Sequence, residues 1–331
     1  MGSEFLNSAS FLVESGDPAT RGFRGCWSSV GVKAGYFVAC VVIEFLHWIG
    51  KIQGGHEWLW RIAFILAAFT TVIGFYIRYT MPESLAYVLY YSNRKKPDTR
   101  TIYRQARAFV KTYPFMCNYA FFASFLAVGT GFFFYLYIPL HAAEYSGLSR
   151  SFILHSTALS LLLVSLLIPV FGYISDKIDR LYMLSLATLG LLTGALPFMM
   201  AINSGNPSLF VMMQLLISIF CACYYSVSSV LLTELFPLQI RCTALSIIFS
   251  IAASLASGVP PLVANWLVLK TQQPNIPCII MMAMAGVVLN NAFWLRRHYR
   301  IGCNEYDISR FSAEKGMLDI EYHGQTADDM S

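Results

Sequence analysis

Long uninterrupted apolar runs are the feature that most restricts how this chain can fold. A helix needs about 20 consecutive apolar residues to cross a hydrocarbon core of about 30 Å. The runs lack the alternating polar pattern of membrane barrel strands, so we predict helices, in which every backbone polar group finds an internal partner. The sequence thus predicts an all-α polytopic membrane bundle with eight spans, at 30–49, 60–80, 114–140, 152–173, 181–202, 207–233, 243–269 and 276–295.

Composition supports a membrane protein and excludes several other classes. The chain is 56% hydrophobic and 12% charged, whereas a soluble domain carries about 25% charged residues. The eight cysteines lie within apolar spans or are scattered through loops and tail, which does not indicate a disulfide framework. Cys221 and Cys223 have no His or carboxylate at ligand spacing. We therefore predict neither a metal nor another cofactor.

Basic residues are distributed unequally among the predicted loops. Nineteen of the 23 Lys and Arg residues lie in 14–33, 78–113, 174–180, 234–242 and 296–331. Because cytoplasmic loops carry the excess of Lys and Arg, we expect these segments to be cytoplasmic. The pattern predicts a multi-pass membrane protein with a cytoplasmic C-terminus. The net charge of +5 then reflects topology, and nucleic acid is not an expected partner.

The chain divides into four regions at changes in composition. We expect an N-terminal part at 1–80, a basic cytoplasmic linker at 81–113, a C-terminal part of six helices at 114–297 and a polar tail at 298–331. The tail has His323 and Asp328 at the spacing of an acyltransferase motif. Such a match arises by chance in a chain with six His and 18 acidic residues.

Two short segments, 220 residues apart, share one pattern. "ESGDPATR" at 14–21 and "ELFPLQIR" at 234–241 each place a glutamate and an arginine seven residues apart, with a proline between them, before a new apolar run. The repeat indicates two related halves, as in secondary transporters. At each corner, the pair Glu14 and Arg21 or Glu234 and Arg241 is expected to lock a helix end to the next helix start in one conformation and separate in another.

A third charged segment strengthens this interpretation. "GYISDKIDR" at 172–180 holds a glycine followed by an acid and two bases in a tight turn between apolar runs. It resembles motif A of the major facilitator superfamily, and "ELFPLQIR" lies where that family places a Glu-x-x-Pro-x-x-x-Arg corner. The resemblance implies gating roles for Gly172, Asp176, Lys177 and Arg180.

Further stretches resemble the metabolite:proton symporter branch, which includes proline/betaine carriers. They are "GSEFLNSASFLVE", "RGFRGCWSSVGVKAG", "WLWRIAF" and "RYTMPES" in the first 84 residues. The chain departs from the family at Ala63, where a proline is usual, and at Ile178 and Asp179, which replace an aromatic residue and a glycine. Aligned this way, residues 5–13 correspond to the end of helix four, and the fold lacks about the first three helices.

The resemblance implies proton-coupled symport of a small organic solute, an osmolyte such as proline or betaine or a carboxylate metabolite, by alternating access. Solute, proton and lipid bilayer are the implied partners, and self-association is left open. Two alternatives stay open: a truncated, non-transporting remnant that does not catalyse uptake alone, and, less favoured, a polytopic membrane enzyme. We predict no catalytic residues.

Polar groups within membrane spans are costly and suggest functional positions. Glu4 matches the acid of a family stretch at the head of helix four, and we take Lys33, Glu44 and His47 as interface anchors at the ends of their span. Candidates for proton or substrate coupling are Glu4, Asn118, Tyr135, Tyr137, His155 and Tyr224.

Overall fold

The computed structural model describes residues 2–298 apart from 16, 53–57, 59, 81–103, 105–106, 108, 112 and 237. The predicted linker therefore lies largely outside the described residues, and the predicted tail lies almost wholly outside them. Every regular element in the described part is helical, as predicted.

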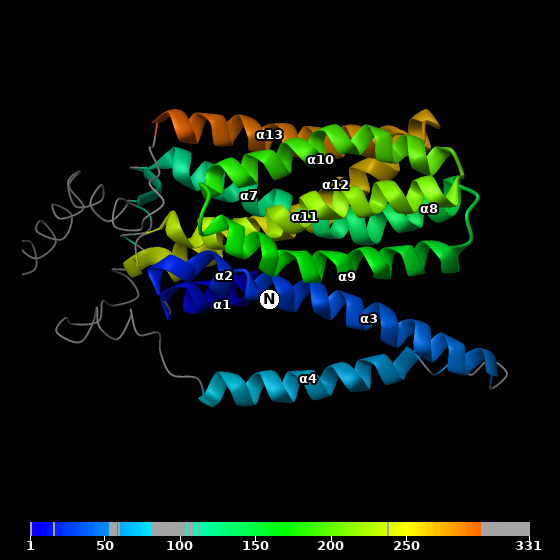
Figure 1. The fold of residues 1–331 in the computed structure, drawn as a ribbon, viewed down its shortest axis with the longest axis horizontal. Coiled ribbons are helices and arrows are strands. Elements are labelled where there is room, and N and C mark those ends of the chain that lie inside the picture. The colour runs from blue at the N-terminus through cyan, green and yellow to red at the C-terminus, as the bar shows by residue number, and fades with distance from the viewer. Residues whose placement is uncertain are drawn as a thin grey trace, which may run out of the picture.

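The N-terminal part consists of α1 (Gly2–Glu14), the short η1 (Pro18–Thr20), α2 (Arg21–Gly25), α3 (Trp27–Ile52) and α4 (Trp60–Thr80). The C-terminal part follows with α7 (Pro114–Phe132), the π-helical turn η2 (Phe133–Tyr137), α8 (Ile138–Tyr145), α9 (Arg150–Ser175), α10 (Arg180–Asn203), α11 (Pro207–Glu234), α12 (Leu238–Thr271) and α13 (Ile276–His298). Figure 1 shows the long helices running side by side as one bundle.

Seven helices of the described part are long and apolar enough to cross a membrane. Six of them match the last six predicted spans. The first runs over Arg21–Leu46 and begins earlier than the predicted span at 30–49. The predicted span at 60–80 coincides with α4, whose apolar stretch, Arg61–Ile77, is shorter than the others. The prediction of a polytopic helical bundle is confirmed.

Helix α11 forms the centre of the C-terminal part (Figure 1). All residues from 221 to 234 in its second half are buried. A helix that is apolar around its whole circumference is expected in such a position, because every face must meet another apolar surface. Helices α9 and α10 pack along it, so that three segments of the sequence form one interior.

Helix α1 packs on the C-terminal part although it is too short to span a membrane. Its buried residues Leu6, Ala9, Ser10 and Val13 repeat at helical spacing and form one stripe. The helix lies against α12, and the rings of Phe5 and Phe249 are 5.5 Å apart. This contact places the end of α1 next to the α11–α12 turn.

Helix α4 has few contacts with the rest of the bundle, and Figure 1 shows it lying apart. Large apolar side chains along it are exposed, among them Phe64, Phe69 and Phe75 at about 70%. A surface of this kind suits a hydrocarbon environment, in which apolar side chains need no cover from water.

Candidate functional site

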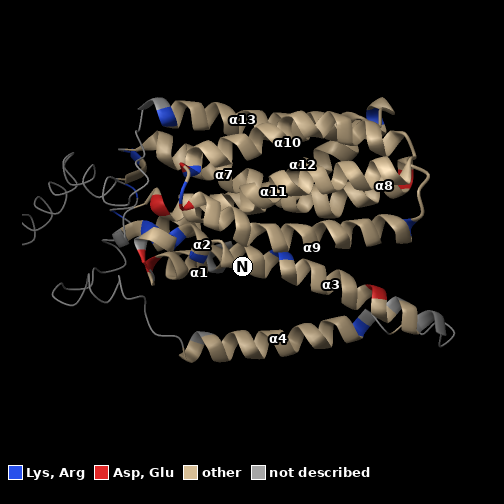
Figure 2. Ribbon diagram, viewed as in Figure 1, with Lys and Arg blue, Asp and Glu red and all other residues tan. Residues whose placement is uncertain are grey.

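Charged side chains from three segments gather at one end of the bundle. They come from the end of α1, the α9–α10 turn and the α11–α12 turn, all predicted from sequence to carry gating residues. We call this group the charged corner cluster: Glu14, Asp176, Arg180, Glu234 and Arg241. Figure 2 shows acidic and basic residues close together at this end.

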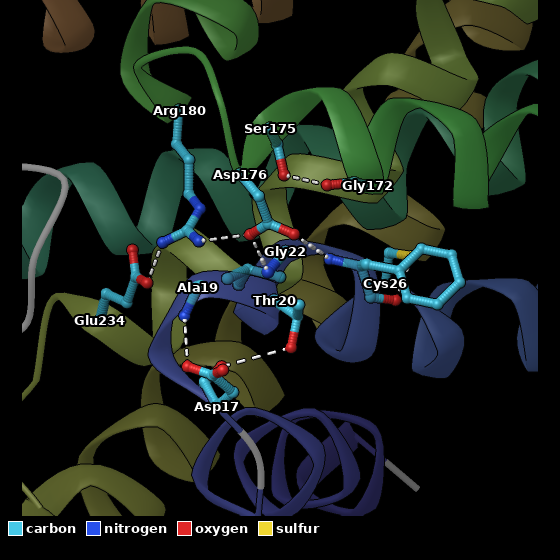
Figure 3. A network of polar contacts seen from close by, with 12 residues as sticks. Asp17, Ala19, Thr20, Gly22, Cys26, Gly172, Ser175, Asp176, Arg180 and Glu234 are labelled. Carbon is cyan, nitrogen blue, oxygen red and sulfur yellow. Dashed lines mark hydrogen bonds and ion pairs between the residues drawn. The ribbon is translucent and has the colours of Figure 1, made fainter.

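Asp176 joins the C-terminal part to the N-terminal part. It ends α9 as the C-cap residue, and its carboxylate accepts two backbone hydrogen bonds from α2 (Figure 3). Gly22 N donates to Oδ1 at 2.6 Å, and Phe23 N donates to Oδ2 at 3.0 Å. The first N–H groups of a helix have no partner within that helix. A carboxylate at this position satisfies them and also interacts favourably with the positive end of the helix dipole.

Arg180 links the same carboxylate to the corner glutamate. Its Nη2 donates to Asp176 Oδ1 at 3.1 Å, and its Nη1 is bonded to Glu234 Oε1. All three side chains are at most 10% exposed. Because these side chains have so little contact with water, removal of one partner would leave another charge uncompensated, which is strongly unfavourable.

A second ion pair joins the two repeated corners. Arg241 Nη1 lies 3.0 Å from Glu14 Oε1, and both side chains are nearly buried. Arg241 Nε also donates to the carbonyl oxygen of Phe236 at 3.0 Å, which holds the arginine against the α11–α12 turn. Bonds from each corner glutamate thus run to a base from a different segment: Glu14 to Arg241 and Glu234 to Arg180.

Two glycines allow α2 and α9 to approach closely enough for these bonds. A Cβ atom on Gly22 would lie 2.6 Å from Asp176 Oδ1 and 2.8 Å from the carbonyl oxygen of Gly172. A Cβ atom on Gly172 would lie 2.5 Å from Cys26 Sγ and 3.1 Å from the carbonyl oxygen of Gly22. Both distances to backbone oxygen are too short for a side chain without a shift of the helices. The glycine of the predicted motif therefore permits the contact that Asp176 makes.

The remaining gating candidates lie beside the cluster. Arg21 begins α2, and Lys177 places its ammonium over the ring of Tyr173, 4.4 Å from the ring centroid. Within the described residues, no group of three or more His, Cys, Asp or Glu side chains could hold a metal ion.

The predicted coupling residues do not gather at one site. Asn118 donates to Asn291 Oδ1 at 2.7 Å, Tyr224 donates to the carbonyl oxygen of Ala123 at 2.8 Å, and Tyr137 stacks on Phe133 with 5.0 Å between ring centroids. These contacts support packing between or within helices.

The other coupling candidates occupy different environments. His155 is exposed on α9, and its Nε2 lies 3.4 Å from Glu44 Oε1. Glu4 lies in α1, but its side chain falls outside the described set. Of these candidates, Tyr135 lies beside a buried charged residue, Lys33.

Lys33 was predicted to be an interface anchor, and that prediction is wrong. The residue is 5% exposed, and its ammonium lies among three tyrosine rings, those of Tyr36, Tyr135 and Tyr225. The reason is that the membrane-length segment begins at Arg21, so Lys33 lies well inside it. The sequence analysis did not identify this position because it placed the start of the span at residue 30, close to Lys33, whereas the segment begins at Arg21.

Comparison with known proteins finds similarity to a family of transporters. The family model of the Major Facilitator Superfamily matches residues 120–305, more than half of the chain. The chain is 26% identical over 296 residues to the proline/betaine transporter of Salmonella typhimurium, covering 87% of this chain and 58% of the relative. It is also 26% identical to the ectoine/proline transporter of Corynebacterium glutamicum, covering 87% of this chain and 60% of that protein.

A solved structure shows the same fold. The proton:xylose symporter XylE superposes with a TM-score of 0.65 at 18% sequence identity, covering 89% of this chain and 67% of that chain. The helical architecture is consistent with this match. The chain belongs to the Major Facilitator Superfamily.

Proposed function

We propose that this chain serves in proton-coupled symport of a small organic solute across the inner (plasma) membrane, by alternating access. Similarity to carriers named for proline, betaine and ectoine and the fold shared with a proton:xylose symporter support this proposal. Solute and proton are its partners in the cycle, and no covalent chemistry is required.

The observation that carries the proposal is the bonding of Asp176 across the two parts of the chain. Its carboxylate accepts from Gly22 N and Phe23 N of the N-terminal part, while Arg180 holds the same carboxylate from the C-terminal part. Alternating access requires one end of the bundle to close while the other opens. A bond between parts at one end stabilises the state that is closed at that end.

The two ion pairs give the charged corner cluster a switching role in this mechanism. Glu14 with Arg241 ties α1 to the start of α12, and Glu234 with Arg180 ties the α11–α12 turn to the start of α10. When the parts rock apart, the bond between Glu14 and Arg241 and the bonds from Asp176 to α2 must break together. We assign gating roles to these residues and to their neighbours Arg21, Gly172 and Lys177.

Uptake by the purified protein tests the function directly. Proteoliposomes with an inward proton gradient are expected to accumulate labelled glycine betaine or proline above the level of empty vesicles. A protonophore should abolish the accumulation, because the gradient supplies the driving force. If neither solute, nor 2-oxoglutarate and citrate as carboxylate probes, accumulates in a gradient-dependent manner, symport by this chain is contradicted.

A further inference from the structure

Lys33 is a cation in the membrane interior without an anionic partner in the described part of the chain. Its side chain is 5% exposed. Among the described residues neither a hydrogen bond nor an ion pair reaches its ammonium group; its contacts are with aromatic rings. A buried charge is expensive unless it is paired and hydrogen-bonded, and in membrane proteins such residues commonly serve function.

Three tyrosine rings surround the ammonium. The distance from Nζ to the ring centroid is 3.6 Å for Tyr225, 5.4 Å for Tyr135 and 5.5 Å for Tyr36. Ring faces attract a cation but carry no net charge, so they compensate only part of its lost hydration. The three N–H donors of the ammonium remain available for an acceptor. We call this group the lysine–tyrosine cluster: Lys33, Tyr36, Tyr135 and Tyr225.

A second donor beside Lys33 also lacks a hydrogen-bond partner among the described residues. Within the part of the chain that the structure describes, the buried hydroxyl of Tyr135 has no hydrogen-bond partner, although buried polar groups almost always have one. In contrast, the hydroxyl of Tyr225 is bonded to Thr130 Oγ1 at 2.9 Å. Tyr135 belongs to the π-helical turn η2, a kind of irregularity that occurs frequently at functional sites. The ammonium and this hydroxyl are thus two donors in one cluster for which the described residues supply no acceptor.

The position of the cluster suits a transported ligand. Lys33 and Tyr36 lie on α3 in the N-terminal part, whereas Tyr135 and Tyr225 lie on η2 and α11 in the C-terminal part. Secondary transporters bind substrate between their two repeats, near the middle of the membrane. The glycine at 131 leaves room for the lysine, since a Cβ atom there would lie 3.4 Å from Nζ. Tyr36 is 41% exposed, so the cluster lies directly below the surface of the described bundle.

We propose that Lys33 binds the carboxylate of the transported solute and that the Tyr135 hydroxyl donates a second hydrogen bond to it. A carboxylate is the group that matches this arrangement: it supplies the missing negative charge and accepts from both donors. The inference rests on the proposed function and assigns the residues that hold the carboxylate of the solute. Lys33 and Tyr135 are then binding residues, while Tyr36 and Tyr225 position the ammonium.

Equilibrium binding to the purified protein tests the inference without requiring transport. The probes are radiolabelled glycine betaine and proline, with choline as competitor because it shares the trimethylammonium group of glycine betaine but lacks the carboxylate. Wild-type protein should bind at least one labelled probe, and choline should displace glycine betaine poorly. Lys33→Met should weaken binding by about ten-fold or more, as expected from loss of a charged hydrogen-bond partner. Lys33→Arg should restore most of the affinity, and Tyr135→Phe should give a smaller loss.

Two controls separate a binding role from a structural one. Lys270→Met removes another lysine in contact with an aromatic ring, 4.9 Å from the centroid of Trp266, and should leave affinity unchanged. Lys33→Met should melt no earlier than wild type, because it removes an uncompensated charge from the interior. Wild-type affinity in Lys33→Met, equal binding of choline, or no binding of either probe by wild-type protein would overturn the inference.

The outcomes also distinguish this inference from the proposed function. Gradient-driven accumulation that is unaffected by Lys33→Met would leave symport standing and remove the role of Lys33. Binding that depends on Lys33, without any gradient-driven accumulation, would support the carboxylate site and contradict symport.

Discussion

At the residue scale, Asp176 bonds the two parts of the chain to each other. One carboxylate accepts from two backbone amides of α2 and from Arg180. Among the described residues, the hydrogen bond of its neighbour Asp179 is a local one, accepted from Tyr182 N as the N-cap of α10. Two aspartates three residues apart therefore differ in role, and the difference comes from what each side chain faces.

Asp176→Asn is expected to open the closed end of the bundle. The amide keeps one acceptor oxygen but turns an NH₂ group toward N–H donors. A hydrogen bond to a charged group contributes about 1.5–3 kcal/mol, which corresponds to about a ten- to one-hundred-fold shift between two conformations. Cys26 is 0% exposed and lies under this contact. Its alkylation by N-ethylmaleimide, followed by peptide mass spectrometry, should become faster by a comparable factor.

Asp179→Asn is the matched control for this measurement, since asparagine caps a helix as well as aspartate does. Its Cys26 should react at the wild-type rate. In addition, Asp176→Asn should lower transport much more than solute binding, because the residue is separate from the lysine–tyrosine cluster. Unchanged Cys26 reactivity in Asp176→Asn would remove the gating role of this carboxylate.

At the element scale, the close packing of α2 on α9 is the contact that brings the charges together. Glycines on both helices face each other, and Cys26 fills the remaining space. Some glycines of the bundle are not under this constraint: a Cβ atom on Gly286 of α13 would meet nothing within 4 Å. Glycines in regular helices therefore differ in how much the helix packing depends on them.

Gly172→Ala is expected to destabilise the protein by about 1–3 kcal/mol, the usual cost of inserting a group into a packed interior. Gly286→Ala should be neutral or slightly stabilising, because alanine is the better helix former and has room. Thermal melting of the purified protein in detergent compares the two. Cys26→Ala should partly rescue Gly172→Ala, because it removes the closest sulfur atom. Equal melting temperatures for both glycine variants would contradict the packing described here.

At the scale of the whole molecule, charged residues lie at both ends of the bundle (Figure 2). The charged corner cluster lies at one of these ends (Figure 2). Among the described residues, Lys33 is the lysine that is buried in the interior. The bias of Lys and Arg toward one set of loops orients membrane proteins with that set in the cytoplasm. We propose that the end carrying the charged corner cluster is cytoplasmic.

Reporter fusions test this orientation. Fusions at Lys96 and after Ser331 should both report the cytoplasm, whereas a fusion at Gly147, in the α8–α9 connection at the other end of α9, should report the opposite side. The reason is the distribution of nineteen basic residues against four between the two sets of segments. An external signal from either of the first two fusions would refute the orientation.

The sequence alone determined the class and most of the elements, and it singled out the residues of the charged corner cluster. Apolar runs of membrane length leave helices as the solution, since backbone groups in lipid need internal partners. The repeated corners and the segment at 172–180 pointed to residues that the structure does bring together, because charged residues at helix ends are conspicuous in an otherwise apolar chain.

Only the tertiary structure decided which charges pair and where the interior charge lies. Glu14 and Arg241 are 227 residues apart in sequence, and Asp176 and Gly22 are 154 apart; spacing within one segment carries no information about such contacts. Lys33 became recognisable only when α3, η2 and α11 placed tyrosines around it. The physical reason is that periodicity and composition indicate whether each helix faces lipid, water or protein. Which charged side chains pair depends instead on which faces of distant helices meet.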